Sequence, residues 1–317
     1  MLHPRKIKKF YRKIKMKVLP ARSFAIVCLL TLFAFSVFAQ SGHSRRATDK
    51  LEGMILSITA SRSGETKDPI RTENLYLYEN AVEQKIKNFS YDPSPAKIVL
   101  LVDNSKTVPA DVAKLQQAVM EFAYEIYEGD ELFVIGYDEK PEIIQEWTDD
   151  ADKIKESLKT FRKQGNPHLF DALNASAAEI LVPLMPGTRK TAIVVIGDGL
   201  DRGSKTPFDK MLSELQNQNI TVYALSMKDR TGGAYRRYQP KANRVIKNLT
   251  EDTGGLAFDI DEAKTAAKTI CDELRKNRYL LSYFPTNTSS YDARRIFIVA
   301  DEGINIRYKT AQPPNID

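Results

Sequence analysis

Cysteine is scarce in this chain, and its placement excludes two ways of stabilising a domain. The 317 residues include only Cys28 and Cys271. Because Cys28 lies in an N-terminal segment with the features of a leader, the rest of the chain keeps a single thiol. A single thiol forms neither an intramolecular disulfide nor a thiolate metal site. The folded part must therefore be held by a hydrophobic core, for which a hydrophobic content of 42% is ordinary.

Histidine and the signatures of nucleophilic catalysis are scarce as well. His168 is the only histidine beyond residue 50, and no Gly-x-Ser-x-Gly occurs. The segment Gly197–Gly203 faintly resembles a dinucleotide-binding loop, but it departs from the strict glycine spacing and puts Asp198 and Asp201 where phosphates would bind. We therefore expect a protein that is not an enzyme. A hydrolase, the alternative, would need a catalytic group that the sequence does not display.

An excess of positive charge is absent from the folded part, although the whole chain carries a net charge of +6. Nine of the 47 Lys and Arg residues lie in residues 1–39, which contain no Asp or Glu, so 38 basic residues face 41 acidic residues in the remainder. The basic balance thus belongs to the N-terminal segment. We expect no nucleic-acid partner, and we interpret Tyr235–Tyr238 (Tyr-Arg-Arg-Tyr) as a solvated loop.

Residues 1–39 have the layout of a secretory signal. A basic stretch precedes the apolar run Phe24–Phe38, and Ala39 provides a small residue suited to cleavage before Gln40. The run is shorter than the roughly 20 residues of a membrane-spanning helix. We expect export to the periplasm or the cell exterior, followed by a flexible linker at residues 40–50. The alternative is an uncleaved anchor in the inner membrane, the one membrane contact that the sequence allows for.

Two β-rich segments enclose the middle of the chain. Residues 51–92 predict a small β unit, and residues 278–312 return to β character. Turns are expected at Glu79-Asn80 and at 301–303. The expected strands are residues 51–60, 74–78, 82–89, 278–284, 294–300 and 304–308. The simplest arrangement joins both segments in one unit beside the central domain.

The central segment, residues 96–277, alternates buried strands with amphipathic helices. Its four apolar runs, rich in Val and Ile, are typical of strands buried on both faces of a parallel sheet. These strands are Lys97–Asp103, Glu131–Asp138, Thr191–Asp198 and Ile220–Ser226. The expected helices are residues 112–126, 170–183 and 206–218, and one that begins at Asp261-Glu262 and ends in the basic residues Arg275, Lys276 and Arg278. The fold class is therefore α/β, a doubly wound and mainly parallel sheet, with a flanking β unit formed by the N- and C-terminal segments.

Two of the expected parallel strands end in aspartate, at the edge where ligands bind in such sheets. Asp103 is followed by the hydroxyl residues Ser105 and Thr107, and Asp198 ends a second strand. Carboxylate and hydroxyl oxygens at alternate positions of a tight loop can converge on a hard cation such as Mg²⁺. The competing interpretation is structural: Ser105 and Thr107 cap the next helix while Asp103 braces the loop. Asp198 at a second strand end shifts the balance towards the cation site.

Residues Lys97–Ser226 resemble a von Willebrand factor A (VWA) domain. Asp103–Thr107 (Asp-Asn-Ser-Lys-Thr) is similar to the metal-ion-dependent adhesion site (MIDAS) of that family, usually written Asp-x-Ser-x-Ser. Asp198–Asp201 resembles the later Asp-Gly element, and Leu169–Ala172 resembles the helix start that follows the MIDAS threonine. Segments outside the domain resemble the VWFA-related family of exported bacterial proteins; they are Gln84–Phe89, Thr253–Gly255 and Tyr279–Pro285.

The resemblance implies a non-enzymatic protein that mediates protein–protein interaction or adhesion. It implies that Mg²⁺ or another divalent cation is held by Asp103, Ser105, Thr107 and Asp198, and that an Asp or Glu of a partner protein supplies the last ligand. This sequence departs from the family pattern at two positions. Pro167 stands about where the MIDAS threonine is expected, with Asn166 and His168 beside it, and Lys106 replaces a glycine. The alternative is therefore a metal-independent scaffold that keeps the fold.

Overall fold

The computed structural model describes residues 53–64, 68–185, 187–228, 240–286 and 292–314. Leu51–Asp317 forms one compact unit, distinct from Met1–Lys50. The predicted signal, the linker and the loop Tyr235–Tyr238 lie outside the described residues. Within the described ranges, no helix is both long and apolar enough to cross a membrane.

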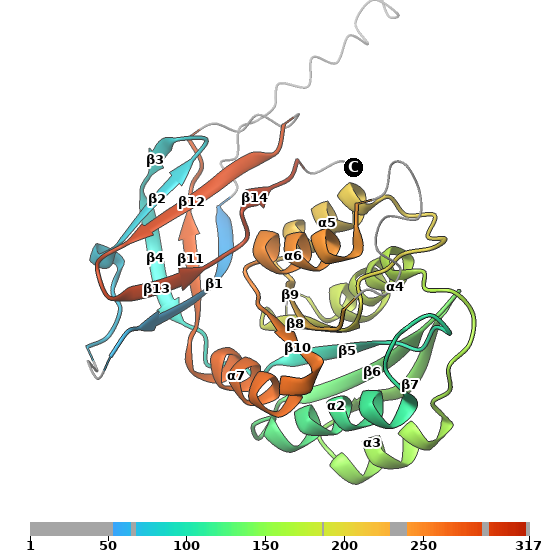
Figure 1. Ribbon diagram of the computed structural model, residues 1–317. Helices are drawn as coiled ribbons and strands as arrows, with labels where there is room; N and C mark the ends of the chain where they lie inside the picture. The colour runs from blue at the N-terminus through green and yellow to red at the C-terminus, as the bar shows by residue number, and fades with distance from the viewer. Residues whose placement is uncertain (1–52, 65–67, 186, 229–239, 287–291, 315–317) are drawn as a thin grey trace, which may run out of the picture. The chain divides into compact units, whose positions relative to one another are not determined.

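A six-stranded sheet forms the centre of this unit, in the order β10-β9-β8-β5-β6-β7 (Figure 1). Its strands are β5 (Lys97–Asp103), β6 (Glu131–Tyr137), β7 (Pro141–Thr148), β8 (Thr191–Gly197), β9 (Thr221–Ser226) and β10 (Ala257–Asp259). All neighbouring pairs are parallel except β6 and β7. The predicted doubly wound, mainly parallel sheet is thereby confirmed, and the antiparallel edge strand β7 is an addition to it.

Helices cover both faces of this sheet, because successive side chains of a strand point to opposite faces. Ile98 and Leu100 of β5 pack in one core cluster with α2, α3 and α7, whereas Val99 and Leu101 pack in a second cluster with α4, α5 and α6. The helices are α2 (Val112–Glu125), α3 (Ala151–Ser157), α4 (Leu169–Ala175), α5 (Phe208–Asn217), α6 (Ala242–Thr253) and α7 (Ala263–Lys276). Short 3-10 turns are Thr72–Asn74, Leu158–Thr160, Val182–Leu184 and Ile260–Glu262.

The helix predicted at residues 170–183 changes its winding along its length. α4 continues into a π-helical segment, Ser176–Leu181, and then into the 3-10 turn Val182–Leu184. Two local causes are visible. The hydroxyl of Ser176 donates to the carbonyl of Ala172 at 2.8 Å, within the helix ladder, and Pro183 has no N–H with which to continue it.

The two β-rich segments form two antiparallel sheets, in the orders β13-β1-β11-β4 and β14-β12-β2-β3. The strands are β1 (Met54–Arg62), β2 (Leu75–Glu79), β3 (Val82–Gln84), β4 (Ile86–Tyr91), β11 (Arg278–Tyr283), β12 (Arg294–Ala300), β13 (Ile304–Arg307) and β14 (Ala311–Gln312). Apolar side chains of β1 and β11 share one buried cluster with those of β2 and β12. The antiparallel unit of N- and C-terminal strands is confirmed, and it is a sandwich of two sheets.

One predicted strand of this unit was wrong. Residues 82–89 are not a single strand, because the chain passes from one sheet to the other after Gln84: β3 pairs with β2, and β4 pairs with β11. Gln84 is buried and exchanges hydrogen bonds with Thr286 through its side-chain amide, at 2.9 Å in both directions. This crossing has no signature in the local apolar pattern.

Arg278 is a second correction. It was predicted as one of the basic residues that end a helix, but α7 ends at Lys276 and Arg278 begins β11 with 1% of its surface exposed. Its guanidinium donates to the hydroxyls of three buried residues, Ser57 at 2.6 Å, Thr59 at 3.1 Å and Thr221 at 2.9 Å. Since Thr221 lies on β9, this cation joins the sandwich to the central sheet.

Glu273 of α7 supplies the negative charge of the same buried network. Its carboxylate accepts hydrogen bonds from Thr59 at 3.1 Å and from Tyr223 at 2.5 Å, and it forms an ion pair with Arg307 of β13. Burial and the neighbouring Glu273 raise the pKa of Tyr223 well above its usual value, so Tyr223 remains a hydrogen-bond donor. Strands from both ends of the chain are thus tied to one helix and one strand of the central domain.

Replacing Arg278 tests this joint. Arg278→Met keeps a side chain of similar length but leaves the hydroxyls of three buried residues without this donor and removes the buried cation of the network, so we expect the free energy of unfolding to fall by about 3–5 kcal/mol. Urea denaturation measures this loss. The matched control is Arg295→Met, at an exposed position of β12, for which we expect a change within about 0.5 kcal/mol. Equal changes in the two variants would contradict the role of the network.

Candidate functional site

The loop after β5 gathers three oxygen-bearing side chains. Asp103, the last residue of β5, is 0% exposed, and its Oδ1 accepts a hydrogen bond from the backbone N–H of Ser105 at 2.8 Å. The hydroxyls of Ser105 and Thr107 are hydrogen-bonded to each other at 3.1 Å. Within the described residues, Oδ2 of Asp103 is buried and receives no well-formed hydrogen bond. A buried carboxylate oxygen in this condition is rare unless a ligand, ion or water satisfies it.

The structural interpretation of this loop is wrong for Ser105 and Thr107, which do not cap the next helix, whereas Asp103 does brace the loop through its bond with the N–H of Ser105. α2 begins at Val112, and its N-cap is Asp111, whose carboxylate accepts from the backbone N–H of Lys114 at 2.8 Å. Ser105 and Thr107 lie more than a helical turn before that start. Their hydroxyls are therefore directed to each other and not to the helix terminus.

Asp198 reaches the same edge of the sheet from β8. β5 and β8 pair in parallel with Val102 opposite Ile196, so Asp103 and Gly197 are neighbours across the sheet. A Cβ on Gly197 would lie 3.0 Å from the Cβ of Asp103, which shows how closely the two strand ends approach. Asp198 follows directly; it is buried, and its Oδ1 accepts from the backbone N–H of Leu200 at 2.9 Å.

The electrostatics around Asp103 favour a bound positive charge. Burial and the neighbouring charge of Asp198 raise the pKa of Asp103 to about 7, although hydrogen bonds from Ser105 and the charge of Lys163 act in the opposite direction. The ammonium of Lys163 does not pair with this carboxylate; it donates to the backbone carbonyls of Val108 at 2.5 Å and Ala110 at 2.9 Å. Asp103 is therefore a buried carboxyl group next to a second one, at a place where a cation would lower its pKa.

These residues fit a divalent cation. Hard cations prefer oxygen ligands, and Mg²⁺ keeps several waters beside one or two carboxylates. Among the described residues, no group of three or more His, Cys, Asp or Glu side chains could hold a metal ion, so any site here depends on hydroxyls as well as carboxylates. The buried Oδ2 of Asp103 and the two adjacent hydroxyls supply such oxygens.

Tyr137 is a site residue that the sequence analysis missed. It ends β6 directly opposite Asp103, it is fully buried, and its hydroxyl makes no well-formed hydrogen bond in the described part of the chain, although it interacts with the carboxylate of Asp103. Burial, the charges of Asp103, Asp198 and Asp201, and this interaction with Asp103 raise its pKa well above the usual value, so it stays a neutral phenol. The sequence shows only that Tyr137 ends a strand expected to be parallel to β5. Its position opposite Asp103 follows only when the register between the two strands is known.

The segment that departs from the family pattern offers no obvious replacement oxygen. Pro167 is buried, and its backbone carbonyl accepts from the N–H of Arg202 at 2.7 Å. The exposed amide of Asn166 donates to Glu139 at 3.4 Å. The ring of His168 lies against Gly203, where an added Cβ would come within 2.1 Å of its Nε2.

The structure also accounts for Lys106 and Gly199. The side chain of Lys106 is exposed and borders a surface hollow with Asp138 and other charged residues, while its backbone N–H donates to the carbonyl of Gly165 at 3.2 Å. Gly199 has a φ of +79°, and a Cβ there would lie 2.6 Å from the carbonyl oxygen of Ala242. The close approach of α6 therefore explains why a glycine stands at this position, and a phosphate-binding role is not needed to explain it.

The raised pKa of Asp103 predicts how the free energy of unfolding depends on pH when a chelator keeps the protein free of metal. The pKa of Asp103 in the folded protein lies above its ordinary value of 3.8, so protonation of this carboxyl group stabilises the folded state. This stabilisation is complete below about pH 4 and is lost as the pH rises through about 7. Asp103→Asn removes this titration, so we expect the variant to be more stable than the wild type at pH 8 by about 2–4 kcal/mol, and to lose that advantage at pH 4. Urea denaturation with EDTA at both pH values measures the difference, and parallel pH profiles would contradict it.

A family model and several solved structures are similar to this chain. Residues 98–200 match the family model of the von Willebrand factor type A domain. None of the curated proteins matches the chain. Among solved structures, the chain is similar to an aerotolerance-related membrane protein from Bacteroides fragilis NCTC 9343 carrying multiple mutations to serines, with 17% identity, a TM-score of 0.45, and coverage of 57% of this chain and 99% of that one.

Two further solved structures are similar at low identity. For the conserved hypothetical protein BatB from Bacteroides thetaiotaomicron, the identity is 17%, the TM-score is 0.44, and coverage is 57% of this chain and 98% of that one. For a von Willebrand factor type A protein from Catenulispora acidiphila, the values are 10%, 0.46, 84% and 75%. The matched residues 98–200 run from β5 to just beyond β8 and include all four candidate ligands, so this part of the chain is a VWA domain.

Proposed function

We propose that this protein is a non-enzymatic binding protein, exported from the cytoplasm, whose VWA domain engages another protein through the face around Asp103. The observation that carries the proposal is the buried Oδ2 of Asp103, which receives no well-formed hydrogen bond from the described residues although the hydroxyls of its loop and a second carboxylate lie close to Asp103. Strand pairing holds this group rigidly, so it is organised before any ligand arrives. A preorganised polar site at the carboxyl edge of a parallel sheet is suited to ligand binding.

The proposed ligand set of a divalent cation is Asp103, Ser105, Thr107 and Asp198, acting directly or through water. When bound, the cation supplies positive charge beside the buried carboxyl group of Asp103. Four side chains with few charges leave room for waters and for one ligand from outside. An Asp or Glu side chain of the partner protein has the oxygen chemistry for that position.

The second candidate is a metal-independent VWA scaffold. Its support is the buried Pro167, which contributes no side-chain oxygen, together with Asn166, whose amide is directed to Glu139. In that case, the loops around Asp103 or the sandwich would form the binding surface without a cation. The two candidates share a fold and a role, and they differ in one measurable property.

Titration with Mg²⁺, Mn²⁺ and Ca²⁺ separates them. Calorimetry should show saturable binding that Asp103→Ala abolishes, because this change removes the central carboxylate, and Mg²⁺ should raise the melting temperature of the wild type but not that of Asp103→Ala. The matched control is Asp209→Ala, an exposed carboxylate on α5, which should bind as the wild type does. If neither heat nor thermal stabilisation is observed at millimolar metal, the metal-dependent mechanism is wrong and the scaffold remains.

Export has a separate test. We expect the protein recovered from outside the cytoplasm to begin at Gln40, since the proposed cleavage follows Ala39. N-terminal sequencing of that material gives the answer directly. A chain that is membrane-associated and still begins at its first residues would establish the uncleaved anchor instead.

A further inference from the structure

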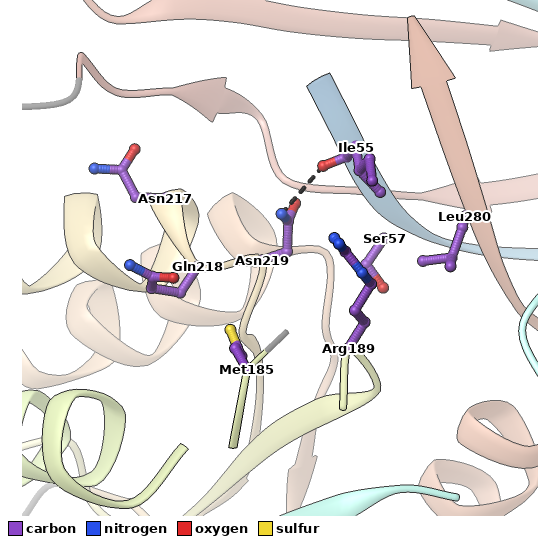
Figure 2. A pocket seen from close by; sticks show the side chains of 8 residues that line it. All are labelled: Ile55, Ser57, Met185, Arg189, Asn217, Gln218, Asn219 and Leu280. Carbon is purple, nitrogen blue, oxygen red and sulfur yellow. Dashed lines mark hydrogen bonds between the residues drawn. The ribbon is translucent and has the colours of Figure 1, made fainter. Parts of the chain in front are cut away.

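A second candidate site lies at the amino ends of the parallel strands of the central sheet, whereas Asp103 lies at their carboxyl ends. A cavity of about 240 Å³ opens where the sandwich meets the amino ends of β8 and β9 (Figure 2). Strands β1 and β11 form one wall, and the turn after α5 and the loop before β8 form the other. The lining residues are Ile55, Ser57, Met185, Arg189, Asn217, Gln218, Asn219 and Leu280.

Arg189 gives this cavity its charge. It is the only ionisable residue of the lining, and the described part of the chain provides it with no ion pair and no hydrogen bond. Figure 2 shows its guanidinium extending towards Asn219 and Ser57. A planar guanidinium with free donors binds a carboxylate or phosphate through two parallel hydrogen bonds. The cavity is therefore suited to an anion.

Asn219 adds a fixed hydrogen-bond acceptor. Its backbone is in the left-handed region, with a φ of +54°, and its Nδ2 donates to the carbonyl of Ile55 at 3.1 Å (Figure 2). This bond orients the amide, so the position of its Oδ1 is set by the fold. Oδ1 is buried and has no donor among the described residues. A ligand with an N–H group would satisfy it.

The rest of the lining sets the size and polarity of the ligand. Ile55, Met185 and Leu280 provide apolar walls, which favour an organic group over an inorganic ion. Since ligand cavities are commonly about 300–1,000 Å³, a cavity of about 240 Å³ fits a small group. We infer that the cavity binds a carboxylate that carries an adjacent N–H donor and a small apolar side chain, the chemistry of an N-acyl amino acid and of the last residue of a peptide.

In this assignment, the carboxylate pairs with Arg189, the N–H donates to Oδ1 of Asn219, and the side chain packs against the apolar wall. The site is independent of the cation proposal, because its residues lie before β8 and β9 and not after them. Titration with Mg²⁺ should therefore be the same for the wild type and for variants of Arg189. The two proposals can fail separately.

Binding of N-acetyl-L-leucine to the full chain tests the inference by calorimetry. We expect saturable binding, at least tenfold weaker binding of N-acetyl-L-leucinamide, which lacks the carboxylate, and at least tenfold weaker binding of the acid by Arg189→Gln. Arg189 is exposed, so this change should leave the melting temperature unaltered. The matched control, Arg295→Gln, should bind as the wild type does.

The acceptor is tested with a second variant and a second ligand. Asn219→Gly tolerates the left-handed backbone but removes Oδ1. It should weaken N-acetyl-L-leucine severalfold and leave 4-methylpentanoate, which has no N–H, unchanged. Equal effects on both ligands would overturn the role of Asn219.

The source of the ligand is distinguished by a tripeptide that ends in leucine with a free carboxylate. Tighter binding of the tripeptide than of N-acetyl-L-leucine indicates a peptide terminus, and weaker binding indicates a free small molecule; both results support the assigned chemistry. The inference is overturned if neither acid binds at large excess over the protein, if the amide binds as well as the acid, or if inorganic phosphate alone binds in an Arg189-dependent way.

Discussion

The central position of β5 is the constraint on which both the fold and the candidate site depend. Parallel neighbours on both sides and helices on both faces leave the strand without access to water from Ile98 to its end. Its last residue, Asp103, must therefore hold a carboxylate where charge is costly. The register that continues the core also brings Tyr137 and Gly197 beside this carboxylate. Strand pairing therefore fixes the position of the central carboxylate, and the loop after β5 adds the hydroxyls of Ser105 and Thr107.

The part of the site that could be predicted from sequence is the part encoded locally. Asp103, Ser105 and Thr107 are close in the chain, so their shared loop was visible before the fold was known. Tyr137 could not be found in the same way, because its proximity to Asp103 depends on the register between two strands. Lys163, whose positive charge partly offsets the rise in the pKa of Asp103, lies in a loop without a recognisable motif.

The fold shows the same division. Unbroken apolar runs identified the buried parallel strands, because a short run of this kind in a globular chain is typical of a strand covered on both faces. Arg278 was misplaced, since basic residues commonly follow a helix and nothing nearby reveals that Ser57, Thr59 and Thr221 will surround it. The passage between sheets after Gln84 was missed for a similar reason: its partner strands, β2 and β11, are far apart in sequence. Both errors arise because the positions of these residues depend on partners that are distant in sequence, which local patterns do not reveal.

The threading of the sandwich also affects how the chain can acquire its structure. β1 lies between β11 and β13, so the earliest strand to be synthesised pairs only with strands that follow residues 92–277. At about 5–20 residues per second, this interval lasts roughly 10–40 s. During that time, both hydrogen-bonding edges of β1 have no native partner, and its apolar face lacks the part of its core cluster that β11 and β12 supply. The central domain can complete its own sheet first, whereas the N-terminal strands depend on protection from aggregation until residues 278–307 have been synthesised.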